Sequence, residues 1–484
     1  MLMPSLDTSI ANAGLPTLAR TFSASFPAVQ WIVLAYLLAI TTLIVSVGRL
    51  GDLLGRRRLL LAGIVLFTVA SLLCGIAPTL WLLIVARAAQ GLGAAIMMAL
   101  TVALVGETVP KEKTGRAMGL LGTMSALGTS LGPSLGGVLI AGLGWRTIFL
   151  VNVPLGLLNF LLVQRHLPAD RRETKPERTR FDHVGTLLLA LTLAAYALAM
   201  TIGPGGFGSL NLTLLVVAVV GAGLFGLVER KAHSPLIRLT MFRNPGLSAS
   251  LAMSALVSTV MMATLVVGPF YLSRALGLEP ALVGLALSVG PLVAALTGVP
   301  AGRIVDRLGA QRMTFLGLGG IATGAAILFL MPMRFGITGY LAPIAVMTAS
   351  YALFQTANNT GIMTGTRPDQ RGVISGLLSL SRNLGLITGA SVMGTVFAFA
   401  AATTDLTTAH PEAVASGMRI TFGVAALLMV GALTIAAGTR RSRTHNPAPG
   451  SRPEPQDARQ QADSFLTTNH TKHANAERLL GRQP

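Results

Sequence analysis

Residues 48–56 read GRLGDLLGR, and residues 302–310 read GRIVDRLGA, 254 positions further along the chain. A second set of glycines repeats at an offset of 257. Its members are Gly115, Gly119, Gly128 and Gly132, which correspond to Gly372, Gly376, Gly385 and Gly389. Two long segments therefore share both order and spacing, and this indicates that the chain contains a duplicated unit.

The composition around these repeats is that of a membrane protein. Of the 484 residues, 52% are hydrophobic and 11% are charged, and the mean hydropathy is +0.67. Soluble domains carry about 25% charged residues, and disordered chains are far less apolar. Thirteen runs between residues 29 and 438 are long and apolar enough to cross a bilayer, which takes about 20 residues. Residues 1–19 add a fourteenth, short run that starts without a recognisable cleavable signal peptide.

The repeat divides these 14 runs into parts. Spans 1–6 correspond to spans 9–14, and spans 7 and 8 are inserted between them. We therefore expect an all-α membrane protein with one six-helix bundle in residues 1–165, the inserted spans in 166–244 and a second bundle in 245–439. Residues 440–484 are polar and predict a disordered cytoplasmic tail. Duplicated six-helix bundles with a site at their interface are a transporter architecture.

The net charge of +19 first suggests a nucleic acid or an anionic surface as partner. Of the 37 Lys and Arg residues, however, 30 fall in one alternating set of loops and in the tail, five in the opposite set and two within spans. Such a bias places both termini in the cytoplasm. The charge therefore indicates multi-pass insertion in the cell (plasma or inner) membrane, facing lipid, and it excludes a nucleic-acid partner.

Two of the charges within predicted spans are Asp7 in span 1 and Arg87 in span 4. A charge at this depth is costly and is usually functional. Both are about equally far from the predicted outer helix ends, so we expect them to lie at a similar depth in the membrane and to interact. A structural acid paired with an arginine or a backbone amide is the alternative for Asp7.

At this point several motifs carry a family resemblance. In order along the chain they are LDTSIANAGLP (6–16), Trp31 with YLLA (36–39), the loop 48–58, RAAQGLG (87–93), GTSLGPSLGG (128–137) and WRTIFLVNVPLG (145–156). The chain resembles the major facilitator superfamily, and more closely its fourteen-span drug:proton antiporters of the EmrB/QacA type. The resemblance covers all spans and implies the major facilitator fold. It also implies that Asp7 and Arg87 take part in proton coupling.

The same resemblance implies a gating loop in each half. Its residues are Gly48, Arg49, Asp52, Gly55 and Arg56, and in the second half Gly302, Asp306 and Gly309. Asp52 is expected to accept hydrogen bonds from a helix N-terminus or an arginine of the other half, where the helix dipole favours an anion. A plain loop would explain the arginines by charge bias, but not the aspartate and glycines in both halves.

Span 5 resembles the antiporter motif of the superfamily. The motif residues are Gly128, Gly132, Pro133, Gly136 and Gly137. Small residues allow close helix approach, and the proline removes one backbone donor and is expected to bend the helix. Ordinary close packing is the alternative. In the second half Gly385 and Gly389 persist, but Ala390 stands where the proline would be, so a bend would be one-sided.

We consider six polar residues as lining for a substrate cavity: Asn12, Tyr36, Gln90, Gln355, Asn358 and Asn359. Arg382 either lines this cavity or partners Asp52 near the cytoplasmic end. The segment 145–156 is expected to serve helix entry and packing. No second strongly placed acid occurs in the deep spans, which disfavours dications as the main substrates.

The predicted function is proton-coupled export of drugs, antibiotics or other amphiphilic small molecules by alternating access. The alternatives are a transporter of another substrate class or coupling mode (sugar, peptide, siderophore) and a non-transporting membrane sensor. An enzyme is not expected, because the G-x-S-x-G match at 128–132 lies within a span without a strand, and no P-loop is present. We expect a monomer without metal or cofactor other than the coupling proton, and nothing indicates a periplasmic adaptor.

Overall fold

The computed structural model describes residues 1–24, 26–167, 182–201, 208–232, 235–401 and 410–445, and in these ranges the regular structure is helical. Residues 1–436 form one compact unit and residues 437–484 a second, of which only the end of the last helix is described. The following paragraphs concern the first unit. The predicted tail lies outside the described residues from 446 onward, and its first six residues, 440–445, belong to that last helix.

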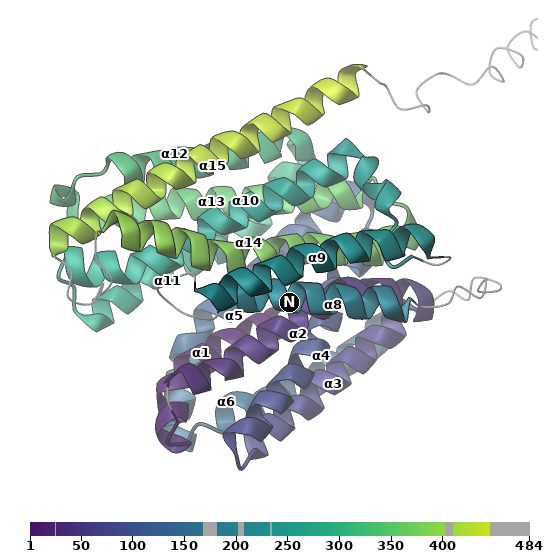
Figure 1. Cartoon of the computed structure of the whole chain (residues 1–484), viewed down its shortest axis with the longest axis horizontal. Coiled ribbons are helices and arrows are strands. Elements are labelled where there is room, and N and C mark those ends of the chain that lie inside the picture. Colours follow the sequence, from purple (N-terminus) through teal and green to yellow (C-terminus); the bar gives the residue numbers. More distant parts are fainter. Residues whose placement is uncertain (25, 168–181, 202–207, 233–234, 402–409, 446–484) are drawn as a thin grey trace, which may run out of the picture. The chain divides into compact units, whose positions relative to one another are not determined.

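The helices that contain the first copy of the repeat follow one another with short turns (Figure 1). They are α1 (Leu2–Thr21), α2 (Phe26–Leu54), α3 (Arg56–Ile76), α4 (Leu80–Thr108), α5 (Thr114–Leu143), α6 (Thr147–Leu150) and α7 (Asn152–His166), with the 3-10 turn η1 (Lys111–Lys113) before α5. The last two together occupy the sixth predicted span.

The remaining helices comprise the inserted pair and the second copy of the repeat. They are α8 (His183–Thr201), α9 (Ser209–Lys231), α10 (Pro245–Phe270), α11 (Pro280–Leu308), α12 (Ala310–Leu330), α13 (Gly336–Met363), α14 (Arg371–Ala400) and α15 (Pro411–His445). Short elements join them: η2 (Leu239–Arg243), the π-turn η3 (Tyr271–Ala275), η4 (Met333–Phe335) and η5 (Pro368–Gln370).

Thirteen helical segments in the described part of the chain are long and apolar enough to cross a membrane. They coincide with the thirteen runs read from residues 29–438. The first predicted span is a helix, α1, but it is not among them, because Asp7, Arg20 and several hydroxyl side chains lower its hydropathy. The multi-pass, all-helical architecture is thus confirmed, and a count of 14 crossings stays a prediction.

Helix pairs recur in the way the sequence repeat predicts. In the first copy α1 packs along α5, and α2 along α4; in the second, α10 packs along α14, and α11 along α13. The two copies meet where α5 packs on α11 and α2 on α14. One apolar core belongs to the second copy, around Val257, Phe354 and Phe422, and another is centred on α2, α3 and α4.

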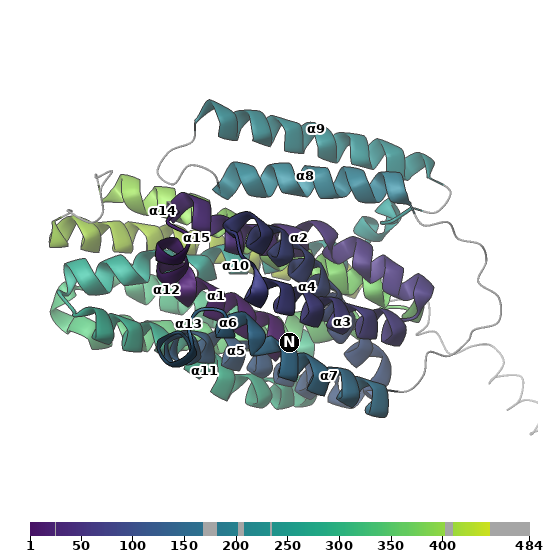
Figure 2. The ribbon, with the colours of Figure 1, turned by 90° about the horizontal axis from the view of Figure 1, so that it is seen from below.

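The inserted helices α8 and α9 form an antiparallel hairpin that lies outside the other helices (Figure 2). Only α8 packs extensively on the rest, and it touches α2 of the first copy and α14 of the second. The hydroxyl groups of Tyr196 on α8 and Thr388 on α14 are hydrogen-bonded. The hairpin therefore covers the line along which the two copies meet.

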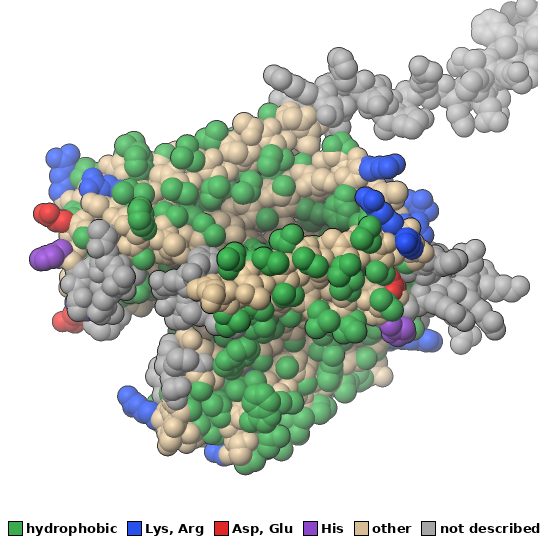
Figure 3. Space-filling model, in the orientation of Figure 1, with side chains coloured by type: hydrophobic (Ala, Val, Ile, Leu, Met, Phe, Trp, Pro, Cys, Tyr) green, Lys and Arg blue, Asp and Glu red, His purple; other side chains and the backbone are tan. Residues whose placement is uncertain are grey.

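The surface has the polarity expected of a protein in a bilayer. On the face shown in Figure 3, hydrophobic side chains are spread along the helices, and the Lys, Arg, Asp and Glu side chains lie near the ends of the helices. Large apolar residues such as Val219 and Leu227 on α9 and Leu427 on α15 are more than half exposed. This apolar surface suits lipid, because water would penalise it.

Candidate functional site

Asp7 and Arg87 form a buried ion pair. The Nη1 atom of Arg87 lies 2.5 Å from Oδ2 of Asp7, and the two residues are 0% and 1% exposed. They come from α1 and α4, 80 positions apart in the sequence. Leaving either charge without its partner would cost about 3–5 kcal/mol, so the pair is held as a unit.

Amide side chains complete the coordination of Asp7. Its Oδ1 atom accepts hydrogen bonds from Nε2 of Gln90 at 2.8 Å and from Nδ2 of Asn152 at 2.7 Å. Gln90 also donates to Oγ of Ser71 at 2.8 Å, and its Oε1 accepts from Arg87 at 2.6 Å. The Asp7 carboxylate thereby links α1 to α4 and α7, and Gln90 extends the network to α3; all four helices belong to the first copy of the repeat.

Arg87 has partners on its other faces too. Its Nε donates to the carbonyl of Ile32 at 3.0 Å, and its guanidinium carbon lies 4.2 Å from the centre of the Tyr36 ring. The Tyr36 hydroxyl donates to the carbonyl of Pro4 at 3.2 Å. Two buried atoms of this cluster have no hydrogen-bond partner, Nη2 of Arg87 and Oδ1 of Asn152. One donor and one acceptor inside the buried cluster are therefore unused.

Asp52, which belongs to the predicted gating loop of the first half, lies in the last turn of α2 and caps the start of a helix in the other copy. Its two carboxylate oxygens accept hydrogen bonds from the backbone N–H of Gly372 at 3.0 Å and of Val373 at 3.2 Å, in the first turn of α14. Arg56 donates to the same carboxylate at 2.8 Å and to the carbonyl of Pro368 at 2.5 Å. Of the two partners expected for Asp52, the structure selects the helix N-terminus.

Asp306 repeats this arrangement in the opposite direction. Its carboxylate accepts from the backbone N–H of Gly115 at 2.7 Å and of Arg116 at 2.9 Å, in the first turn of α5. Ala310 stands where the first loop has Arg56, so the second contact lacks the arginine. We call these two cross-copy contacts the latches, and the end of the molecule that carries them the latch face.

The loop glycines serve the latches in two ways. Gly55 and Gly309 have φ angles of 97° and 87°, a conformation that L side chains rarely adopt, and they allow the tight turns after α2 and α11. Gly48 packs on the backbone of Gly372, and Gly302 on that of Gly115, with no room for a side chain. Arg49, which follows Gly48, forms no hydrogen bond or ion pair among the described residues.

The glycines of the antiporter motif hold α1 against α5. Gly128 and Gly132 face the backbone and side chains of α1 so closely that a Cβ atom would overlap them, and Gly136 packs on Ile10. Gly137 has open space around its Cα atom. Helix α5 continues through Pro133, which is exposed. Most of the motif therefore forms a helix–helix contact next to Asp7.

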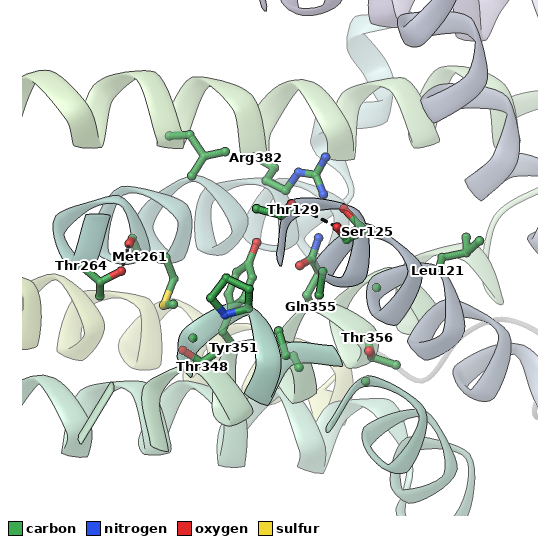
Figure 4. Close-up of a pocket in the computed structure, with 18 of the residues that line it drawn as sticks. Leu121, Ser125, Thr129, Met261, Thr264, Thr348, Tyr351, Gln355, Thr356 and Arg382 are labelled. Atoms are coloured by element: carbon green, nitrogen blue, oxygen red, sulfur yellow. Dashed lines mark hydrogen bonds between the residues drawn. The ribbon is translucent and has the colours of Figure 1, made fainter. Parts of the chain in front are cut away.

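A cavity of about 290 Å³ lies between the two copies and is lined mainly by α5, α10, α11, α13 and α14. This is near the lower end of the range for small-molecule sites. Figure 4 shows Tyr351, Gln355 and Arg382 directed into it, opposite Ser125 and Thr129 of α5. Methionine and leucine side chains make up much of the remaining wall.

Two of the six residues predicted to line a cavity do so, Gln355 and Asn359. Asn12 is exposed and bonded within its own helix, and Tyr36 and Gln90 belong to the Asp7 cluster. Asn358 is buried and exchanges hydrogen bonds with Ser250 on α10. These four residues do not line this cavity. Successive residues of a helix point about 100° apart, so spacing along the sequence does not say which of them faces a cavity.

Some residues of the site were missed or left open by the sequence. Asn152 was assigned to helix entry, although it is the third ligand of Asp7. Ser5 and Ser9, two positions on either side of Asp7, bond to Ser125 Oγ and to the carbonyl of Thr129, both at 2.7 Å. Serine is common in helices, so the residue type of Ser5 and Ser9 did not indicate a role in the site.

The comparisons with known proteins agree with this architecture. A model described as Major Facilitator Superfamily matches residues 1–390. "Multidrug resistance protein Stp" of Mycobacterium tuberculosis is 33% identical over 402 residues, which cover 82% of this chain and 74% of the relative. "Drug efflux pump JefA" of the same species is 32% identical over 405 residues, covering 82% and 78%.

A solved structure shares the fold at low sequence identity. The proton:xylose symporter XylE aligns with a TM-score of 0.61 and 15% identity, covering 89% of this chain and 93% of that one. At this identity the likeness concerns the fold alone. Together, the family match, the relatives and the fold indicate a multi-pass membrane transporter and not an enzyme. The chain belongs to the Major Facilitator Superfamily.

Proposed function

We propose that this protein is a proton-coupled exporter of amphiphilic small molecules, a member of the fourteen-span drug:proton antiporters of the EmrB/QacA type. Relatives named for multidrug resistance and drug efflux, at 33% and 32% identity, support export as the activity. The observation that carries the coupling is the buried carboxylate of Asp7. It is the ion-pair partner of Arg87, and its neighbours on α1 are bonded to the wall of the cavity.

The path from the proton site to the cavity is short. Asp7 holds α1 against α4 and α7, and Ser5 and Ser9 hold the same helix against α5. Ser125 and Thr129, the partners on α5, line the cavity. A shift of α1 therefore reaches the substrate site through two hydrogen bonds, without a long chain of intermediates.

Protonation of Asp7 would supply that shift. The neutral carboxyl no longer attracts the guanidinium of Arg87, so the charge of Arg87 loses its partner in an apolar site. Any arrangement of α1 and α4 that gives Arg87 another partner then gains relative stability. Protonation and substrate binding would bias the same two states, which is all that coupling requires.

The two bundles, residues 1–165 and 245–439, would rock about the cavity between them. The latches hold one end of this interface closed, and both must break before that end opens. We propose that the latch face is the cytoplasmic one and that both termini lie there, as the bias of Lys and Arg residues indicates. The protein would work as a monomer, with the proton as coupling ion and no other cofactor.

Transport by the full-length protein in proteoliposomes tests this function. An internal pH-sensitive dye records proton movement when ethidium, N-phenyl-1-naphthylamine or its 8-sulfonate is added. We expect substrate-dependent proton movement in the wild type and its loss in Asp7→Asn. Glu112→Gln removes a carboxylate that is exposed on η1 and should leave the movement unchanged.

Two results would count against the proposal in different ways. Unchanged proton movement in a folded Asp7→Asn variant would refute the role of Asp7. Transport of the dyes by the wild type without proton movement would refute antiport and favour another coupling mode.

A further inference from the structure

The charged side chain of Arg382 enters the cavity between the two copies. Among the described residues that line it, Arg382 of α14 has the charged side chain, and the other side chains are apolar, hydroxyl or amide; Met1, also in the lining, bears the α-amino group as well. The Nε atom of Arg382 is buried and has no hydrogen-bond partner. In Figure 4 its guanidinium extends into the cavity near Gln355 and Thr129.

Among the described residues, the acids Asp7, Asp52 and Asp306 are engaged elsewhere. Asp7 is paired with Arg87, and Asp52 and Asp306 cap helices at the latch face. Arg382 forms no hydrogen bond or ion pair with another residue in the described ranges. Asp52, the partner considered from the sequence, is bonded to Arg56 and α14 instead. A positive charge therefore faces the cavity, and none of the described residues supplies a counterion for it.

This arrangement has a consequence for the charge of the ligand. An arginine in a largely apolar cavity pays for its lost hydration unless an anion or a strong acceptor enters with it. Its guanidinium offers parallel N–H donors that fit the two oxygens of a carboxylate or the oxygens of a sulfonate. A cationic ligand would meet a like charge and would find no carboxylate among the described lining residues.

We propose that the cavity binds amphiphiles that carry an anionic group, and that Arg382 is the residue that recognises this group. The apolar part of the ligand would lie against Met261 and Leu121, and Gln355 and Ser125 would supply further donors next to the anion. The proposal rests on the exporter function in that it names the substrate class of the same cavity.

A matched pair of fluorescent probes tests the proposal by binding alone. N-phenyl-1-naphthylamine and its 8-sulfonate differ only in the sulfonate, and ethidium supplies a cation. Binding is measured on the full-length protein in nanodiscs of zwitterionic lipid, with empty nanodiscs subtracted. We expect the sulfonate to bind the wild type at least tenfold more tightly than the neutral probe, and ethidium to bind least.

Variants at one position isolate the charge. Arg382→Gln should remove about tenfold of the affinity for the sulfonate and leave that for the neutral probe unchanged, which also shows that the cavity is intact. Arg382→Lys should retain most of the preference. Arg334→Gln, which removes an exposed charge outside the cavity, should have no effect.

The outcomes separate this inference from the proposed function. Equal affinities for the two naphthylamine probes in the wild type, or an unchanged preference in Arg382→Gln, would overturn the inference even if transport occurs. Tight, Arg382-dependent binding of the sulfonate without any transport would leave the inference standing and overturn the exporter function.

Discussion

Replacing Asp52 by asparagine should weaken the closed state of the latch face. The carboxylate receives two backbone N–H groups of α14 and the guanidinium of Arg56. Asparagine keeps the shape, but it removes the charge and turns an N–H group toward donors. A charged hydrogen bond contributes about 1.5–3 kcal/mol, and a carboxylate at a helix N-terminus about 0.3–1 kcal/mol.

Some of these bonds survive in the amide, so we expect a net loss of about 2–3 kcal/mol from the closed state. This equals a roughly 30- to 150-fold change in the ratio of closed to open molecules. A closed population of about 99% would fall to about 40–75%. Because Asp52 touches neither the cavity nor the Asp7 cluster, the affinity of a closed molecule for substrate should stay the same.

Spin labels at Gln164 on α7 and Gln311 on α12 would report the opening of the latch face as a change in the distance between the labels, measured by pulsed electron paramagnetic resonance. Both side chains are exposed and lie on different copies of the repeat. Cys74, the single native cysteine, is buried and does not compete for the label. We expect a longer-distance population in Asp52→Asn and a larger one when Asp306→Asn is added. Identical distance distributions in the wild type, in Asp52→Asn and in the exposed control Glu112→Gln would refute the reasoning.

Three further predictions follow from single contacts. Arg87→Met leaves the Asp7 carboxylate buried without its partner and should lower the free energy of unfolding by about 3–5 kcal/mol. Adding Asp7→Asn should restore much of this loss, as measured by thermal unfolding, and a further loss of stability in the double variant would contradict the pairing. Gly302→Val would overlap the Gly115 backbone and should open the latch face in the same label experiment, whereas an unchanged distance would show that the crossing can relax. Asn358→Leu breaks a buried 2.7 Å hydrogen bond to Ser250 and should cost about 1–3 kcal/mol of stability without changing probe affinity. The matched variant Gln355→Leu, in the cavity wall, should change probe affinity and leave stability nearly unchanged. An effect of Asn358→Leu on probe affinity would place Asn358 in the site.

The latches show how far a repeat in the sequence can predict structure. The matching aspartates and glycines of the two loops indicated that both halves carry the same device, and each aspartate caps a helix of the other copy. The partners themselves could not be chosen from spacing, because Gly372 lies 320 positions from Asp52. The same holds for Arg382. The sequence allowed it either to line the cavity or to pair with Asp52, and the choice depended on which distant segment lies next to it.

The sequence by itself determined the helical, membrane-spanning architecture, its duplication and the presence of a few charges within the spans. These properties follow from the length of apolar runs and from residue order, which are local to the chain. Only the tertiary structure decided that Asn152 joins Asp7 and Arg87, and that Gln355 lines the cavity while Asn358 does not. It also decided that Arg382 enters the cavity without a counterion among the residues the structure describes. Helix rotation and the approach of distant segments set these contacts, and both depend on how the whole helix set packs.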